Sequence, residues 1–427
     1  MLRQARNSYA EVDATFGEID DAAARLDVPP VSAALFGGEP RSIRRLLDEP
    51  AEVLQLAIFG VSVVVHRILT AQGVRPRLLV GHSFGEIAAL VAAGAFTLAD
   101  GVQLVCARTA ALRTWEGMGG MAAIGVDQET AGHVAGVLDE PDLVVACLNA
   151  PRQTVLAGPL AALDRAERLA TTLDVLFARL HLPYASHHPS MRPAVADFVA
   201  RMGEVSQQPL RHAVHSPVHG RRYTDDDDLK QALAECLVLP VRFTDTVRTL
   251  HAKGCSTFIE SGALNALTKC VEQTVPNVLA FAPLVDPQGE DAGLRAAGQP
   301  PAPGSRNGQS RPAPAPVRAP SPPEAQVVGV ADDVPPAPVT PSRLDRHQIL
   351  VELRELYADA LEYPADLLTE DALLEAELGV DSLKQTSLLG RVVERFDLPE
   401  RSAELPVWEL PTLGRIADYV NGAEISR

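Results

Sequence analysis

Ser83 stands in the pattern Gly-His-Ser-Phe-Gly, between a short apolar run at 78–80 and an alanine-rich stretch with helical periodicity. The run predicts a buried parallel strand and the stretch predicts a helix, so the serine lies at a strand-to-helix turn. The flanking Gly81 and Gly85 permit a tight turn, a nucleophile elbow, that projects the hydroxyl out of the sheet toward the N-terminal N–H groups of the helix. Unlike a chance match in a loop, this context predicts a serine that attacks an acyl carbon.

A serine hydroxyl is a weak nucleophile and needs a base that titrates near neutral pH. Two imidazoles, His187 and His188, follow Tyr184-Ala185-Ser186 about a hundred residues downstream. His82 adjoins the serine and is interpreted as structural. A lone histidine in a loop is more often a structural group than a base, so the residue types alone leave the choice open.

Two further residues could carry chemistry. Arg108 lies 25 residues after Ser83 on an expected helix that starts at Thr97-Leu98-Ala99-Asp100, a capping-box pattern. A helix arginine is ordinarily a solvated surface group, although its planar guanidinium can also bind a carboxylate with two parallel hydrogen bonds. Ser382 follows Leu378-Gly379-Val380-Asp381 at the start of another expected helix, where an N-cap serine is the ordinary interpretation.

The elements that must position these residues follow from periodicity. An apolar helix is expected over 52–71 and a strand over 75–80, leading into the turn at Ser83. Between about 119 and 182 the order strand, helix, strand, strand, helix, strand predicts a ferredoxin-like unit inserted in a larger α/β domain. The chain then returns through an expected helix near 191–204 and a strand at 257–259.

The last third of the chain changes composition. Residues 286–343 hold 14 of the 34 prolines, a composition typical of an extended, disordered tether. Residues 344–427 carry 18 acidic and 8 basic side chains, with apolar residues at helical spacing. This second unit is expected to be a small acidic helical bundle.

Several of these motifs together resemble a known pair of domains. Residues 51–284 resemble the acyltransferase domain of modular polyketide synthases and malonyl-CoA:acyl-carrier-protein transacylase. The matching features are Gly81-His82-Ser83-Phe84-Gly85-Glu86, Arg108, Asn149-Ala150-Pro151, Tyr184-Ala185-Ser186-His187-x-Pro, and Pro240-Val241-Arg242-Phe243. Residues 344–423 resemble an acyl carrier protein through Leu378-Gly379-Val380-Asp381-Ser382-Leu383.

The resemblance implies an α/β fold, namely an α/β-hydrolase-like parallel sheet with an inserted ferredoxin-like subdomain, followed by a four-helix acyl carrier bundle. The expected boundaries are 1–285 for the acyltransferase domain with its insert at about 119–182, 286–343 for the Pro/Ala-rich linker, and 344–427 for the carrier.

The resemblance also implies roles. Ser83 would be acylated and His187 would be its base, because the family usually has serine where His188 stands. Arg108 would hold the free carboxylate of a malonyl-type group, and the Phe84 N–H would help to bind the oxyanion. Gln55, Tyr184 and Ser186 would line the substrate site. Ser382 would carry 4′-phosphopantetheine, attached by a separate phosphopantetheinyl transferase.

The choice of acyl group stays open. Tyr184-Ala185-Ser186-His187 is similar to the methylmalonyl signature, whereas a bulky apolar residue such as Phe84 after the nucleophile is closer to the malonyl pattern. One methyl group changes binding by only about 1–3 kcal/mol in a pocket, so a mixed signature is compatible with mixed selectivity.

Charge and composition narrow the partners. The net charge of −17 disfavours nucleic acid and anionic membranes. Five cysteines without metal-ligand spacing indicate packed thiols and a cytoplasmic setting, and no metal is implied. The N-terminus lacks a secretory pattern, and the apolar window 56–65 is too short to cross a bilayer. The expected partners are a malonyl-type acyl-CoA, the phosphopantetheinyl transferase, and a ketosynthase or other polyketide synthase modules.

One departure from the family is substantial. The family's domains open with a strand ending in Gly-Gln-Gly, whose N–H completes the oxyanion hole, and this chain contains no Gly-Gln-Gly. Losing one such donor costs roughly 3–4 kcal/mol of barrier. Either the start is truncated, another chain supplies the strand, or activity is impaired. The alternatives to an acyltransferase are therefore a serine thioesterase or hydrolase, and a catalytically impaired carrier or scaffold.

Overall fold

The computed structural model describes residues 2–38, 49–173, 175–180, 182–286, 289–299, 345–361, 382–396 and 412–425, with a few positions at 368–374 and 398. The first described unit, up to residue 299, contains helices and three sheets. The second, from residue 345, contains three described helices.

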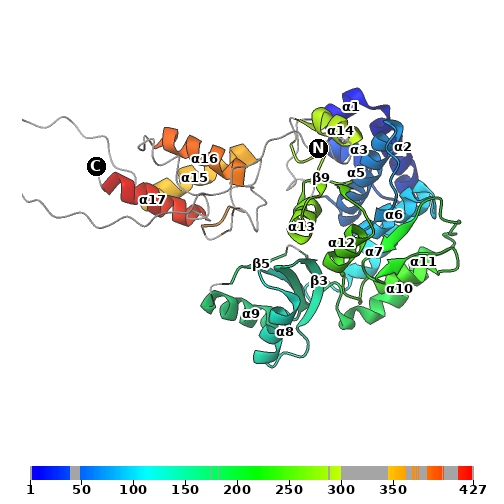
Figure 1. The fold of residues 1–427 in the computed structure, drawn as a ribbon, viewed down its shortest axis with the longest axis horizontal. Coiled ribbons are helices and arrows are strands. Elements are labelled where there is room, and N and C mark those ends of the chain that lie inside the picture. Colours follow the sequence, from blue (N-terminus) through cyan, green and yellow to red (C-terminus); the bar gives the residue numbers. More distant parts are fainter. Residues whose placement is uncertain are drawn as a thin grey trace, which may run out of the picture.

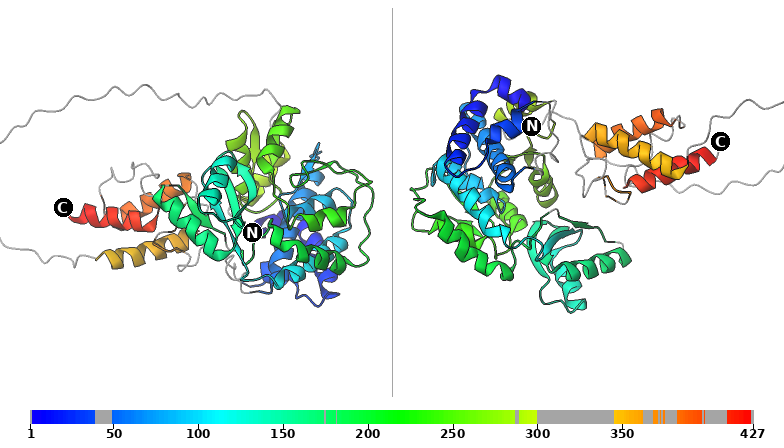
Figure 2. Two further views of the ribbon diagram at one scale, coloured as in Figure 1. Left: turned by 90° about the horizontal axis from the view of Figure 1, so that it is seen from below. Right: turned by 180° about the vertical axis from the view of Figure 1, so that it is seen from behind.

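Three helices open the chain: α1 (Arg3–Ser8), α2 (Ala10–Ala24) and α3 (Val31–Phe36). Residues 2–38 contain no strand. Figure 2 shows these helices in blue; α2 packs against both α5 (Ala51–Ala71) and α7 (Leu98–Arg113). Helix α5 has 21 residues and is long and apolar enough to span a bilayer, so the shorter window at 56–65 understated its length. Since 61% of its apolar window is buried, it is packed as a core helix.

The elbow lies in a small mixed sheet. Strand β1 (Leu79–Val80) precedes it and α6 (Gly85–Ala92) follows it. Strand β1 pairs in parallel with β6 (Val214–Ser216), and β6 pairs antiparallel with β7 (Arg221–Arg222). The strand expected at 75–80 is thus shorter than predicted, whereas the capping box at the start of α7 is present as predicted.

The inserted unit has the predicted order of elements. Its strands and helices are β2 (Gly120–Ile124), α8 (Gln128–Val137), β3 (Val144–Ala150), β4 (Gln153–Gly158), α9 (Leu160–Thr172) and β5 (Phe177–Arg179). The sheet order is β3-β4-β2-β5 with antiparallel neighbours, the ferredoxin-like arrangement. Helices α8 and α9 cover one face of this sheet (Figure 1). Their shared core includes Leu156, Leu163 and Ala166.

The chain returns to the larger unit through η1 (Pro189–Met191), α10 (Arg192–Met202), α11 (Leu229–Glu235) and α12 (Phe243–Ala252). Helix α10 packs against α7. Strands β8 (Thr257–Ile259) and β9 (Leu279–Phe281), joined through α13 (Ala266–Thr274), form a separate parallel pair. Helices α12 and α13 pack against each other and against β3.

Helix α14 (Glu290–Gly298) lies within the range 286–343 that composition assigned to the linker, so the linker begins later than expected. Its Leu294 and Ala297 are fully buried, and it packs against α1 and α5. The buried Glu290 carboxylate accepts hydrogen bonds from the N–H groups of Gln4 at 3.0 Å and Ala5 at 3.1 Å, and from that of Leu2. Composition did not predict this helix, because the helix is stabilised by contacts with α1 and α5, which lie far away in the sequence.

The second unit contains α15 (Arg346–Leu361), α16 (Ser382–Arg395) and α17 (Leu413–Ile425). Their apolar faces meet in one core, which includes Leu353, Leu388 and Ile416. Apolar residues at helical spacing are therefore buried in this unit, as the sequence predicted. The fourth helix of the expected bundle lies outside the described residues.

Candidate active site

Ser83 lies at a strained turn, with φ of 51°. Positive φ is costly for a residue with a side chain, so such strain marks candidate functional positions. Gly81 is needed sterically, because a Cβ there would lie 2.3 Å from the Glu86 Cα. A Cβ added at Gly85 would meet no neighbouring atom within 4 Å, so only the first of the two glycines is required by a close approach.

The structure brings Ser83 and His187 together. The Ser83 Oγ lies 2.8 Å from His187 Nε2, and His187 Nδ1 lies 3.0 Å from the main-chain carbonyl of Leu239. Since a carbonyl only accepts, Nδ1 carries the proton and donates it, which leaves Nε2 as the acceptor for the serine hydroxyl. The imidazole is 3% exposed. Its burial, reinforced by the nearby His82 and Arg108, lowers the pKa of His187 to about 3, so the ring is neutral at pH 7.

The two rival histidines point elsewhere. His188 Nε2 bonds the Asp142 carbonyl at 2.8 Å, and its Nδ1 bonds the Ser190 hydroxyl at 2.7 Å. His82 Nε2 bonds the Asn149 Oδ1 at 2.8 Å, and burial lowers the pKa of His82. Both rings are therefore held by structural partners, and His187 is the imidazole placed to accept the Ser83 proton.

Arg108 is a buried cation beside this pair. It lies on α7, is 8% exposed, and makes no ion pair with any side chain in the part of the chain that the structure describes. Its guanidinium carbon lies 5.3 Å from the centroid of the Phe84 ring, a cation–π contact. A buried guanidinium without a carboxylate partner is costly, so the site is electrostatically suited to an anionic group of a ligand.

The remaining predicted residues differ in placement. Ser186, the residue before His187, is buried, and its hydroxyl has no hydrogen-bond partner among the described residues. Tyr184 is half-buried at the edge of the core. Gln55 is half-buried on α5, and within the described ranges no hydrogen bond joins it to Ser83.

The sequence did not predict three groups at this site. No feature of the sequence indicates the Leu239 carbonyl, because every residue has a main-chain carbonyl. Cys236, grouped with the other packed thiols, has its buried side chain within hydrogen-bonding reach of the Ser83 hydroxyl; burial raises the pKa of this thiol, which stays protonated. Asn149 belonged to a quoted motif without a role and proves to hold His82.

Glu86 anchors the elbow from behind. Its carboxylate is completely buried and accepts hydrogen bonds from the Ser216 hydroxyl at 2.6 Å and the Tyr223 hydroxyl at 2.7 Å. Desolvation raises the pKa of Glu86 to about 7, which these donors partly oppose. The first turn of α6 is thereby tied to β6 and to the residue after β7.

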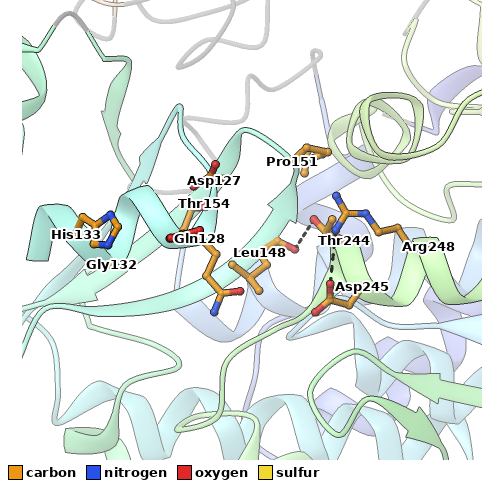
Figure 3. Close-up of a pocket in the computed structure, with 12 residues that line it drawn as sticks. Asp127, Gln128, Gly132, His133, Leu148, Pro151, Thr154, Thr244, Asp245 and Arg248 are labelled. Atoms are coloured by element: carbon orange, nitrogen blue, oxygen red, sulfur yellow. Dashed lines mark hydrogen bonds and ion pairs between the residues drawn. The ribbon is translucent and has the colours of Figure 1, made fainter.

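A cavity of about 590 Å³ lies apart from this chemistry, between the insert and α12. Its lining includes Asp127, His133 and Asp245 but none of the Ser83 group. Figure 3 shows Thr244 bonded to the Leu148 carbonyl, at 3.1 Å, and Arg248 beside Asp245. The site at Ser83 is therefore assigned from its geometry and not from cavity size.

Comparison with known proteins gives the family of each unit. Residues 45–297 match the acyl transferase domain family, which covers more than half of the chain. The chain belongs to the acyl transferase domain family. Residues 351–420 match the phosphopantetheine attachment site family, whose members carry covalent 4′-phosphopantetheine. The acyltransferase domain is thus followed by a carrier domain in one chain.

Relatives and solved structures support the assignment. Polyketide synthase GfsA from Streptomyces halstedii is 31% identical over 229 residues, covering 53% of this chain and 3% of that protein. The malonyl CoA-acyl carrier protein transacylase of Coxiella burnetii has a TM-score of 0.62 at 25% identity, covering 70% of this chain and 93% of that one. The acyltransferase domain from module 8 of the salinomycin polyketide synthase has a TM-score of 0.61 at 28% identity, with 67% of each chain covered. The chain thus spans a small part of the curated relative.

The carrier domain offers a fitting attachment position. Helix α16 begins at Ser382, so this residue stands at a helix N-terminus. The dipole of the helix favours an anionic group there, which suits a phosphodiester linked to the serine oxygen. The residue type and its position therefore fit the phosphopantetheine group.

Proposed function

We propose that this chain transfers a malonyl-type acyl group from coenzyme A, through an ester on Ser83, to a phosphopantetheine thiol on Ser382. The observation that carries the proposal is the 2.8 Å contact between Ser83 Oγ and the neutral Nε2 of His187. The malonyl transacylase of Coxiella burnetii supports the choice of reaction by likeness. The polyketide synthase relative supports a place beside ketosynthase or other synthase modules.

The residues of the acyltransferase domain would divide the work as follows. His187 Nε2 takes the hydroxyl proton as the Ser83 oxygen attacks the thioester carbon, and it returns this proton to the departing sulfur of coenzyme A. The Phe84 N–H, which donates to no backbone acceptor among the described residues, is free for the developing oxyanion. For the second transfer His187 takes a thiol proton and then returns it to the Ser83 oxygen.

The phosphopantetheine group on Ser382 would supply a thiol that accepts the acyl group. Its attachment requires a phosphopantetheinyl transferase acting on the carrier domain. We assign 1–298 to the acyltransferase, with the insert at about 119–182, and 344–427 to the carrier. Compared with the sequence-based boundaries, the acyltransferase gains α14.

Arg108 supports a dicarboxylic acyl group. The buried guanidinium would form charge-assisted hydrogen bonds with the distal carboxylate, which acetyl and propionyl groups lack. Phe84, Tyr184 and Ser186 would contact the rest of the acyl group. Whether a methyl branch is accepted depends on a difference of about 1–3 kcal/mol, which the mixed signature leaves to experiment.

A serine hydrolase is the main competitor. In such enzymes a carboxylate usually supports the histidine, whereas here the Leu239 carbonyl does so. Intact mass spectrometry after incubation with malonyl-CoA, methylmalonyl-CoA or acetyl-CoA tests the proposal, with Ser83→Ala as control. A persistent malonyl or methylmalonyl adduct on Ser83 supports it, rapid release of free acid indicates a hydrolase, and no adduct from any thioester indicates a scaffold.

A further inference from the structure

Both members of the reacting pair lie on strained backbone. The φ of Ser83 is 51° and that of His187 is 61°, and a positive φ is costly for a residue with a side chain. Such a conformation persists only where the surrounding structure determines it. The contacts that hold these two turns therefore help to keep the Ser83 Oγ at 2.8 Å from His187 Nε2.

A histidine adjoins each of the two strained residues. His82 comes directly before Ser83, and His188 comes directly after His187. Both of these neighbouring rings bind one stretch of the insert, residues 142–150, which contains β3 and the two residues before it. The insert therefore contacts the turn of the nucleophile and the turn of the base.

The contact beside the nucleophile is made by a side chain. The His82 Nε2 lies 2.8 Å from the Oδ1 of Asn149, near the end of β3. Since an amide oxygen only accepts, Nε2 carries the proton and donates it. The His82 ring also makes an edge contact with the Phe243 ring, with the two centroids 5.4 Å apart. The residue before Ser83 is thus held between the insert and the start of α12.

The contact beside the base is made with the main chain. The buried His188 ring donates from Nε2 to the Asp142 carbonyl at 2.8 Å. Its Nδ1 accepts from the Ser190 N–H at 3.1 Å and so caps η1. One imidazole therefore joins the start of η1 to the insert, directly after the base.

A third contact supports the carbonyl that orients the base. This carbonyl belongs to Leu239, and Val241, two residues further, pairs with β3. The Val241 N–H donates to the Ala146 carbonyl at 2.9 Å, and the Leu148 N–H donates to the Val241 carbonyl at 2.8 Å. The segment behind His187 is therefore bonded to the same strand of the insert.

Strand β3 is well fixed within the structure. It pairs with β4 from Val144 to Ala150, and Cys147 on this strand is buried. Cys147 belongs to a hydrophobic cluster that also contains Ala185 and Val241, so the insert shares a core with the segments around the base. Helices α12 and α13 pack against β3. A displacement of this strand would therefore move the supports of both turns together.

We propose that Asn149 and His188 are positioning residues through which the insert keeps the turns of Ser83 and His187 aligned. Within the described residues, neither side chain forms a hydrogen bond with the reacting pair. Asn149 acts through His82, and His188 acts through the backbone that it shares with the base. The inference rests on the proposed function, because it takes Ser83 and His187 as the groups that react.

Pre-steady-state acylation of the full chain tests this proposal. Asn149→Ala leaves the His82 Nε2–H without its acceptor. His188→Asn keeps an acceptor where Nδ1 stands but has no donor where Nε2 stands. Each variant should lower the maximal rate of Ser83 acylation by malonyl-CoA by at least about 10-fold, because a small misplacement of reacting groups is costly. The half-saturating concentration of malonyl-CoA should change by less than about 2-fold, because neither residue is placed to bind the acyl group.

Two further variants separate positioning from stability. His188→Gln places an amide N–H where the imidazole Nε2–H stands, and it should keep at least about half of the original rate. Asp127→Ala removes the side-chain cap of α8, in the insert but outside residues 142–150. It should lower Tm without changing the rate, and it is the matched control for a less stable insert.

Four results would overturn the proposal. They are an unchanged rate in Asn149→Ala or His188→Asn, an equal loss in His188→Gln and His188→Asn, a loss of rate in Asp127→Ala, and an effect confined to the half-saturating concentration. The first would show that the contacts are dispensable. The second and third would assign the effect to general stability, and the fourth would assign it to substrate binding.

A fluorophosphonate probe makes the test independent of the proposed reaction. It phosphonylates an activated serine oxygen with loss of fluoride, whatever acyl donor the protein uses, so its rate with Ser83 reports the same geometry. Slower labelling of Asn149→Ala and His188→Asn, in a chain that forms no malonyl adduct, would support the positioning roles and reject the proposed function. Reaction of Ser83 with neither reagent in the unaltered chain would overturn both.

Discussion

The His187 Nδ1 donates to the main-chain carbonyl of Leu239 at 3.0 Å, and no carboxylate takes that place. This contact fixes the tautomer and the ring orientation while leaving the site without a negative charge behind the base. In a deeply buried site the ring is therefore strongly biased to its neutral form, which bears directly on how the reaction should respond to pH.

We expect Ser83 acylation to be insensitive to pH between about pH 5 and pH 8, without the inflection near 6.5 of an ordinary histidine. The reason is that burial lowers the pKa of His187 to about 3, so the base stays neutral until the solution is far more acidic. Quenched-flow measurement of the acyl adduct at several pH values checks this. A rate that halves near pH 6.5 would mean that the ring is solvated.

Replacing Arg108 should change the preferred acyl group. Arg108→Ala should lower kcat/KM for acylation by malonyl-CoA by at least about 100-fold, because each of two charge-assisted hydrogen bonds contributes roughly 1.5–3 kcal/mol. Acylation by acetyl-CoA should change little. Arg113→Ala is the matched control. Arg113 is an exposed arginine on the same helix as Arg108, and it forms an ion pair with Glu52 of α5. An equal loss for both thioesters would assign Arg108 a structural role.

The two glycines of the elbow should respond differently to substitution. Gly81→Ala forces a Cβ to within 2.3 Å of the Glu86 main chain, so the turn must open and both Tm and acylation should fall. Gly85→Ala meets no atom within 4 Å and adds helix propensity of up to about 1 kcal/mol at the start of α6. Thermal unfolding of both variants compares them. A larger loss in Gly85→Ala would contradict the steric argument.

Glu86 should make stability depend on pH. Its folded pKa of about 7 lies above the ordinary 4.5, so the folded state binds the extra proton and stability falls as pH rises through this window. The difference corresponds to up to about 3 kcal/mol. Glu86→Gln should lack this contribution. Urea unfolding of both proteins from pH 4.5 to 8 measures it, and parallel slopes in the two proteins would refute it.

The sequence pattern was sufficient to predict those elements that neighbouring residues stabilise. The elbow, the capping box at Thr97 and the order of the insert's strands and helices each depend on neighbouring residues or on a repeating apolar pattern. The preference for His187 over His188 came from a family register, and the structure gives its physical basis, because His188 is held by Asp142 and Ser190.

Contacts between distant residues were not predictable from pattern. No residue type signals that the Leu239 carbonyl will hold His187, or that Cys236 will lie beside Ser83. The pairing of β1 with β6 joins residues more than a hundred positions apart, and no local pattern indicated it.

The bond between Glu290 and the first turn of α1 has a practical consequence for dividing this chain. A protein cut where the composition changes, near residue 286, would expose three main-chain N–H groups at its own beginning and uncover the apolar surface that Leu294 now shields. An acyltransferase domain expressed separately should therefore extend past residue 298, so that the hydrogen bonds between the two ends of the domain are kept.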